Sequence, residues 1–230
     1  MSFHRCGRGL RTAALVSLCA LAAPAHAVLI TGNLANASES PATGSNFSAD
    51  LSYSFANATT GTLTVDITNT SPGALGGFLT AFALNNPGGA ITISSLVGPA
   101  SFTQLGLGGN TVDAQPFGNF DLGASATGGT FQGGGAPDGL LSGESGHFVF
   151  SLTGTGLDTL TANSFVNELS VGPGDGKGDQ FFVARFRGLE NTPDSDKVPG
   201  VVVPEPTTYA LLLAGMGLLL FAMRRSTRPK

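Results

Sequence analysis

Apolar and polar residues alternate with a period of two along much of the chain between Val28 and about Val201. Successive side chains of a β-strand point to opposite faces, so this period indicates strands with one buried face. The residues between the first two such segments, 57–61, are turn formers and predict a hairpin. The apolar positions of those two segments are Ala49, Leu51, Tyr53 and Phe55, followed by Leu63, Val65 and Ile67.

Five further segments have the β-branched and aromatic composition of strands. No amphipathic helix of any length interrupts them. The first two should form a second hairpin across the sequence Asn-Pro-Gly-Gly. We therefore expect an all-β fold, a single antiparallel jelly-roll-like β-sandwich of about eight to ten strands over residues 28–187. The five segments are 76–86, 90–97, 146–154, 158–170 and 179–188.

Two stretches interrupt the strand pattern. Residues 108–143 are rich in glycine, which favours long loops or weak edge strands, with low order expected around Ala124–Gly139. Residues 188–202 are polar and punctuated by proline, which is typical of a linker. We therefore expect residues 188–202 to be a tether that holds the β-domain away from the membrane.

The N-terminal residues 1–27 have the three parts of a secretory signal peptide. Arg5, Arg8 and Arg11 precede the apolar run Ala13–Ala23, which is too short to span a membrane. Ala25 and Ala27 then form an A-x-A cleavage site with the residue between them. We predict an N-terminal signal helix that is removed after Ala27.

Removal of the signal peptide also removes both cysteines, Cys6 and Cys19. The mature chain then forms no disulfide and has no thiolate for metal binding or catalysis. Its middle, from Val28 to Val203, holds four basic and fourteen acidic residues, a net charge of −10. This disfavours nucleic acid as a partner, because phosphate binding needs a basic surface. It is compatible with cations or with neutral polymers.

The C-terminal segment 203–230 resembles a membrane anchor at first sight. Thr208–Met223 carries no charge, and a helix of that length measures about 24 Å, short for a bilayer but sufficient for a thin one. Arg224 and Arg225 follow at once and should stay cytoplasmic. Pro204 and Pro206 precede the predicted transmembrane helix and hold the residue between them in an extended backbone.

The C-terminal segment has three parts in order: Glu205 between two prolines, a short apolar span and a basic end. This order resembles the PEP-CTERM sorting signal of Gram-negative bacteria. The resemblance implies that Pro204, Glu205 and Pro206 are recognised by exosortase, a membrane-embedded cysteine protease resembling transpeptidases, which cuts near them. It further implies an inner-membrane intermediate, then delivery to the outer cell surface or the exopolysaccharide (biofilm) matrix. The alternative is a plain single-span anchor with a proline-rich stalk. Residues 63–73 and 182–200 more loosely resemble the β-rich ectodomains of such proteins.

Little in the middle of the chain suggests catalysis. After signal removal His147 is the only histidine, and Ser145 lies too close to it along a glycine-flanked turn to form a nucleophile–base pair. A single histidine also excludes a histidine-based zinc site. We therefore expect a protein that is not an enzyme.

The best candidate for a metal site is an acidic, glycine-rich loop. Asp175 and Asp179 flank three residues including Lys177, and Asp194 and Asp196 follow in the sequence. Spaced carboxylates in such a loop can wrap Ca²⁺, but the lysine would repel the ion and the spacing is not that of a known calcium loop. The alternative is a hairpin turn that joins segments 158–170 and 179–188.

Thr60, Thr62 and Thr64 place hydroxyls on one strand face, as in ice- or sugar-binding surfaces. Because such a surface needs several neighbouring strands, we interpret this face as solvent-exposed only. The sequence thus predicts a non-catalytic exported protein, sorted by exosortase, with a structural or interaction role. The alternative is a surface module that binds Ca²⁺ or carbohydrate.

Overall fold

The structure of the chain is a computed structural model, which describes residues 27–32, 43–126, 128–132, 136–172, 179–190, 194–203 and 215–216. Its regular structure is mainly β, as predicted. Within the described residues of 27–203, one short α-helix, α1 (Ala162–Val166), and three 3-10 turns accompany the strands. The strands are β1 (Val28–Gly32), β2 (Phe47–Asn57), β3 (Thr60–Asn69), β4 (Gly76–Leu84), β5 (Thr92–Val97), β6 (Phe102–Leu105), β7 (Val112–Asp113), β8 (Asn119–Phe120), β9 (Leu122–Ala126), β10 (Leu140–Leu141), β11 (Ser145–Thr153), β12 (Phe182–Leu189) and β13 (Ser195–Val202).

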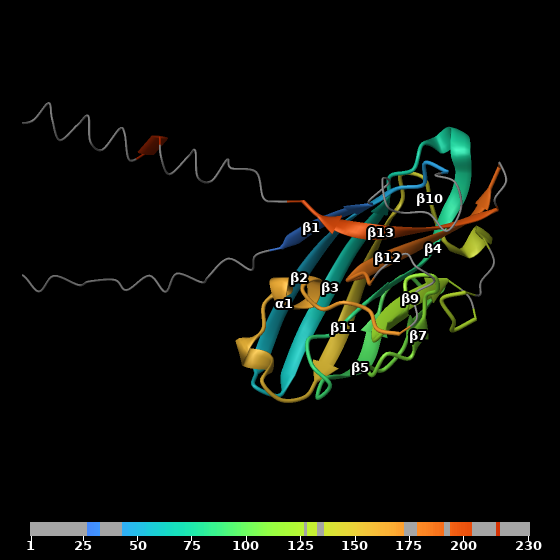
Figure 1. The fold of residues 1–230 in the computed structure, drawn as a ribbon. Coiled ribbons are helices and arrows are strands. Elements are labelled where there is room, and N and C mark those ends of the chain that lie inside the picture. Colours follow the sequence, from blue (N-terminus) through green and yellow to red (C-terminus); the bar gives the residue numbers. More distant parts are fainter. Residues whose placement is uncertain are drawn as a thin grey trace, which may run out of the picture.

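A single 11-stranded antiparallel sheet contains all of these strands except β7 and β8, which pair with each other. Its order is β5-β11-β3-β2-β1-β13-β12-β4-β9-β6, with β10 beside β4. The sheet folds over so that β5, β11, β3, β2 and β1, the first half, face β12, β4, β9 and β6, the second half (Figure 1). Strand β13 joins the halves. The expected sandwich is thus one continuous sheet rather than two separate sheets.

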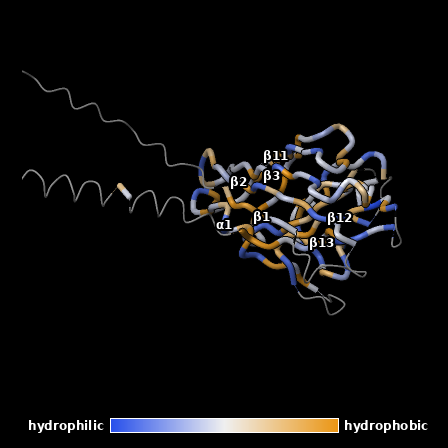
Figure 2. Tube along the Cα trace, turned by 90° about the horizontal axis from the view of Figure 1, so that it is seen from above, coloured by the Kyte–Doolittle hydropathy of each residue, from blue (hydrophilic) through white to orange (hydrophobic). Residues whose placement is uncertain are grey.

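Phenylalanine rings from the two halves meet in the main hydrophobic core. Phe82 on β4 lies 4.8 Å from the ring of Phe148 on β11 and stacks on Phe182 at 5.8 Å. Phe47 on β2 also reaches Phe182, at 5.3 Å. Burying each such ring stabilises the fold by about 2–3 kcal/mol. Figure 2 shows hydrophobic stretches of the trace along strands in the middle of the domain and many hydrophilic stretches in the outer loops.

The first predicted hairpin is confirmed, and the second is wrong. Strands β2 and β3 pair across residues 57–60, but β4 pairs with β12, β9 and β10, whereas β5 pairs with β11. The segment between β4 and β5 therefore carries the chain from the second half of the sheet to the first. Residues Leu79–Leu84 are buried on both faces, because the main core covers one face of β4 and a second hydrophobic cluster covers the other.

The predicted strand 158–170 is wrong too: its residues form a 3-10 turn, Leu157–Thr159, and helix α1. The Ser164 hydroxyl accepts a hydrogen bond from the Thr161 backbone N–H at 3.1 Å, which stabilises the first turn of the helix. The ring of Phe165 then packs on Tyr53 with a centroid distance of 5.3 Å. Helix α1 therefore covers part of the core beside β2 (Figure 1).

The expected linker 188–202 is corrected by β13, which pairs with β1 on one side and β12 on the other. Pro199 belongs to this strand. Its nitrogen faces β1, since Val203 N donates to Leu29 O and backbone N–H groups alternate sides along a strand. It lies just past the last β1 pair, Gly32↔Gly200, so the missing N–H breaks no pairing with that strand.

The low order expected around Ala124–Gly139 is corrected for the described part of that stretch, whereas residues 127 and 133–135 lie outside the described residues. Strand β9 is fully buried, and Phe131 belongs to a second hydrophobic cluster on the outer side of the second half. Gly123 allows β9 to approach β4 closely, because a Cβ there would lie 2.1 Å from Phe82 O. All strands of the sheet and all members of both clusters lie between Val28 and Val202. That stretch therefore carries the complete core.

Candidate functional site

The predicted sorting motif follows the sheet without a linker. Strand β13 ends at Val202, and the backbone N–H of Val203 still donates to Leu29 O at 2.9 Å. Pro204 is the next residue. Only residues 203–207 separate the strand from the predicted span at Thr208, at most about 17 Å of extended chain. The β-domain is therefore tied directly to the motif.

The other end of the domain lies at the same place. Ile30 pairs with Val202, so the start of β1 and the end of β13 are adjacent (Figure 1). Ala27, the predicted last residue of the signal peptide, is exposed and immediately precedes β1. A cut after Ala27 would leave Val28, which is buried, as the first residue of the strand that joins β2 to β13.

Several predicted residues lie outside the described residues, namely Ala25, Pro204, Glu205, Pro206, Asp175, Arg224 and Arg225. The signal helix over 1–27 does as well, apart from Ala27. Of the predicted span 208–223, only Gly215 and Met216 are described, and both are helical. Within the described part of the chain, no helix has the length and apolar character needed to cross a bilayer.

The structure does not bring the other calcium candidates together. Asp179 precedes β12, whereas Asp194 lies beyond its far end and precedes β13. The length of β12, about 25 Å, therefore separates them. Asp196 is buried and accepts hydrogen bonds from the Thr43 hydroxyl and from the Lys197 backbone N–H at 2.8 Å. No group of three or more potential metal ligands occurs among the residues described.

His147 contacts Asp66 rather than Ser145. Its Nδ1 lies 2.5 Å from an oxygen of Asp66, directly opposite on β3, and both side chains are exposed. The Ser145 hydroxyl instead lies 2.7 Å from that of Thr68. Ser145 and His147 therefore each face a different residue of β3, Thr68 and Asp66, and do not face each other.

The threonine face of β3 does have neighbouring strands, which the sequence did not reveal. Thr62 lies between Ser54 on β2 and Ser151 on β11, and Thr64 lies opposite Ser52. The outer face of the first half is therefore an array of hydroxyls across three strands. The sequence was interpreted as giving a single exposed row of threonines on one strand. In the structure, hydroxyl side chains of two neighbouring strands lie beside that row.

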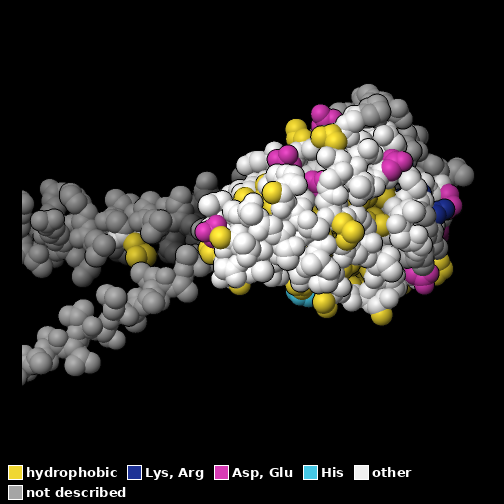
Figure 3. All heavy atoms as spheres, turned by 90° about the horizontal axis from the view of Figure 1, so that it is seen from below, with side chains coloured by type: hydrophobic (Ala, Val, Ile, Leu, Met, Phe, Trp, Pro, Cys, Tyr) yellow, Lys and Arg dark blue, Asp and Glu magenta, His cyan; other side chains and the backbone are white. Residues whose placement is uncertain are grey.

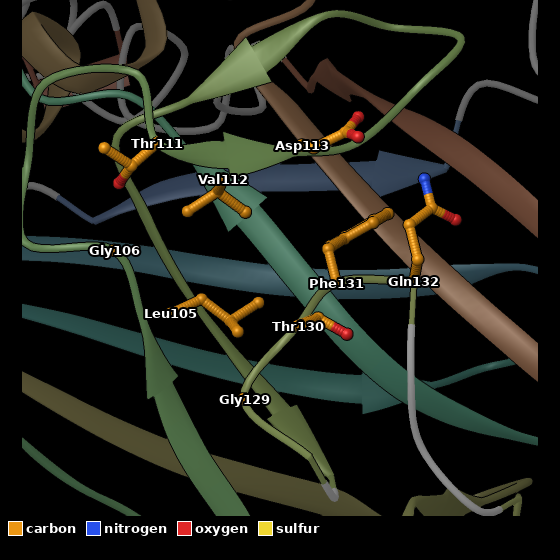
Figure 4. A pocket seen from close by; sticks show the side chains of 9 residues that line it. All are labelled: Leu105, Gly106, Thr111, Val112, Asp113, Gly129, Thr130, Phe131 and Gln132. Atoms are coloured by element: carbon orange, nitrogen blue, oxygen red, sulfur yellow. The ribbon is translucent and has the colours of Figure 1, made fainter.

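Sequence reasoning missed a pair of adjacent hollows over the second half of the sheet. The first has a volume of about 300 Å³, and Leu105, Val112 and Phe131 converge on it from three segments (Figure 4). Its rim carries Thr111 and Thr130. The second, of about 320 Å³, lies beside Gln104 and Leu107 and shares Gly106 and Thr111 with the first. Together they form a groove, called the β6–β7 groove below.

Two buried cations hold the loops around this groove. Arg185 on β12 and Lys197 on β13 are direct cross-strand partners and are 7% and 3% exposed. Arg185 Nη1 donates to Phe131 O at 2.8 Å, and Lys197 Nζ donates to Gln115 O. Buried charges are costly unless hydrogen-bonded, so these contacts fix both loops against the sheet.

Gly106, which lines both hollows, leaves no room for a side chain. Gly106 has a φ of 65°, and a Cβ there would lie 2.2 Å from Asp121 O. The Asp121 carboxylate in turn accepts backbone N–H groups from Asn86 at 3.0 Å and Asn110 at 2.6 Å. The backbone of the groove is therefore tightly determined.

The comparisons with known proteins concern the end of the chain. Residues 202–226 match the family model described as the PEP-CTERM protein-sorting motif. Neither a curated protein nor a solved structure matches the chain. The matched motif implies an exported protein that exosortase sorts toward the surface. The chain thus carries a PEP-CTERM sorting motif, which starts at the last residue of β13.

Proposed function

We propose that the chain is delivered by exosortase to the outer surface or exopolysaccharide matrix of a Gram-negative bacterium, where its β-domain has a non-catalytic, structural or interaction role. The match of residues 202–226 to the sorting motif carries this proposal. The signal peptide predicted at 1–27 brings the domain across the inner membrane. The apolar span then holds it there until the motif is cut.

The junction at Val203 supports this order of events. Because the sheet ends one residue before Pro204, the folded domain stays close to the membrane while the span is in place. A membrane-embedded protease then meets the motif beside the domain. A free linker, as the sequence suggested, would have let the domain move far from the enzyme.

The surface of the domain is compatible with an extracellular location. On the face seen in Figure 3, most of the area is uncharged, carboxylates are scattered and hydrophobic side chains appear as separate spots. Such a surface keeps a protein soluble without favouring polyanions as partners. Of the two ligands in the alternative, calcium gains no support from the placement of Asp179, Asp194 and Asp196. Carbohydrate gains support from the β6–β7 groove.

The proposal is tested with Glu205→Ala and the matched control Glu190→Ala, an exposed acid in the turn between β12 and β13. In the native organism, Glu205→Ala should accumulate in the inner membrane, whereas Glu190→Ala should reach the surface like the wild type. Both are followed by fractionation and immunoblotting. Equal surface delivery of all three would contradict the proposal.

A further inference from the structure

We propose that the β6–β7 groove binds a short stretch of a neutral saccharide, with one sugar unit in each of its two hollows. The observation that carries this is the pair of adjacent hollows, about 300 and 320 Å³, that share Gly106 and Thr111. A hollow of this size is at the lower end of the range for small-ligand sites and holds one sugar ring. Two adjacent hollows of this size can hold two consecutive units of a linear saccharide.

The lining has the mixed chemistry that sugars need. Sugar rings present C–H faces and many hydroxyls, each both a donor and an acceptor. Leu105, Val112 and Phe131 form an apolar floor, and Leu107, 63% exposed, offers an apolar surface beside the second hollow. The hydroxyl of Thr111 at the rim can donate and accept hydrogen bonds. Such a site bonds hydroxyls without requiring charge.

The charges around the groove select against anionic ligands. Among the described residues that line the two hollows, none is lysine, arginine or histidine, and Asp113 is the only charged one. Its carboxylate points away from the apolar floor in Figure 4 and accepts the backbone N–H of Gln115 at 3.1 Å. The two nearby cations, Arg185 and Lys197, are buried beneath the loops and bond to backbone carbonyls. A phosphate or uronate would therefore meet repulsion without compensation.

The groove is also rigid enough to bind without a large ordering cost. Arg185 holds Phe131 O, and Gln132 Nε2 donates to Gln115 O at 3.5 Å. Gln104 Nε2 donates to Gly106 O at 2.9 Å on the opposite wall. Loops fixed in advance lose little conformational entropy when a ligand binds. This inference deepens the interaction role proposed above but does not depend on sorting by exosortase.

The test uses a ¹⁵N-labelled fragment 28–203, which carries the complete sheet and both clusters. Cellotriose, laminaritriose and maltotriose are added up to about 10 mM, where a site with a millimolar Kd is largely filled. Trigalacturonate, of similar size but with three carboxylates, is the anionic match. We expect at least one neutral trisaccharide to shift the amides of Leu107, Thr111 and Phe131, with trigalacturonate having no effect.

Two variants then assign the site. Thr111→Val keeps the shape of an exposed side chain but removes the hydroxyl shared by both hollows, and should weaken binding about two- to ten-fold. Leu107→Ser removes the exposed apolar surface and should weaken it similarly. Thr153→Val, an exposed threonine on β11, is the matched control and should bind like the wild type.

Three results would overturn the inference. One is that no neutral trisaccharide shifts any groove amide. Another is that the shifts appear on the hydroxyl array of β3 around Thr62 and Thr64 instead. The third is that trigalacturonate binds the groove as tightly as the neutral probes, since the absence of lining cations would then have no role. A failure of Glu205→Ala to change delivery would affect only the sorting proposal.

Discussion

The backbone N–H of Val203 donates to the carbonyl oxygen of Leu29 at 2.9 Å, so the last hydrogen bond of the sheet lies one residue before Pro204. This contact joins β1, the first strand described, to β13, the strand at whose last residue the sorting motif begins. Folding of the domain and presentation of the motif are therefore linked by a shared pair of strands, β1 and β13.

Removing β13 should unfold the domain. It lies between β1 and β12, so a fragment 28–194 loses the joining strand and the buried side chain of Val198. A linker, by contrast, could be removed without effect. We expect fragment 28–203 to show one cooperative thermal transition by circular dichroism and fragment 28–194 to show none. An unchanged melting temperature in the shorter fragment would mean that 195–202 is not part of the fold.

The Phe82 ring at the centre of the main core should be essential to stability. It contacts Phe148, Phe150 and Phe182 and is fully buried. We predict that Phe82→Ala lowers the free energy of unfolding by about 3–5 kcal/mol, measured by urea denaturation. The control Phe55→Ala, at a ring that is 50% exposed, should cost well under half of that. Equal losses at both sites would argue against the packing of the two halves.

Close approach of β9 and β4 requires a glycine at position 123. A Cβ there would lie 2.1 Å from Phe82 O, so Gly123→Ala must push the strands apart and should cost about 1–3 kcal/mol. Gly89→Ala is the control, because no atom lies within 4 Å of its added Cβ. Urea denaturation of both variants decides the matter. A neutral Gly123→Ala would show that β9 does not pair with β4 as described.

Tyr53 should make stability depend on alkaline pH. Burial, and secondly the charge of Asp158, raise the pKa of its hydroxyl above the usual value of about 10. The hydroxyl donates to Leu157 O at 2.7 Å. A folded-state pKa above the unfolded value means that this stabilisation is fully present below about pH 10 and is lost as pH rises through the folded-state pKa.

Tyr53→Phe should therefore flatten the alkaline loss of stability while lowering stability at pH 7 by about 1 kcal/mol. In fragment 28–203 Tyr53 is the only tyrosine, because the other one, Tyr209, lies beyond it. Its ionisation can thus be followed alone by absorbance at alkaline pH. A midpoint at or below that of free tyrosine would contradict the buried hydrogen bond.

The sequence predicted what depends on local pattern and failed where partners are distant. The β2–β3 hairpin follows from alternation on both sides of a turn, and both were visible. The pairing partners of β4 could not be predicted, because alternation indicates a strand but not the strand that pairs with it. At 158–170 the apolar residues Leu160, Phe165 and Val166 suited a strand, and the weak Thr161–Ser164 capping signal was overlooked. Pro199 made β13 look like a linker.

The sorting motif could be predicted from the sequence, whereas the β6–β7 groove could not, for the same reason. Pro204, Glu205 and Pro206 are contiguous with an apolar span and a basic end, so the motif could be identified from the residues alone. The β6–β7 groove combines residues 104–113 with residues 129–132, brought together by a glycine-rich chain that suggested only loops. No signal in the sequence places Phe131 beside Val112. Only Arg185, a charged residue between apolar residues of a predicted strand, is a sequence signal for a buried polar contact nearby.

The most direct test of the central claim is C-terminal mass spectrometry of the wild-type protein recovered from the cell surface or the surrounding matrix. We predict a mature chain that begins at Val28, ends near Pro204–Pro206 and lacks both Arg224 and Arg225. A surface-exposed protein that retains the residues through Lys230 would contradict sorting by cleavage and would leave the segment as a simple membrane anchor.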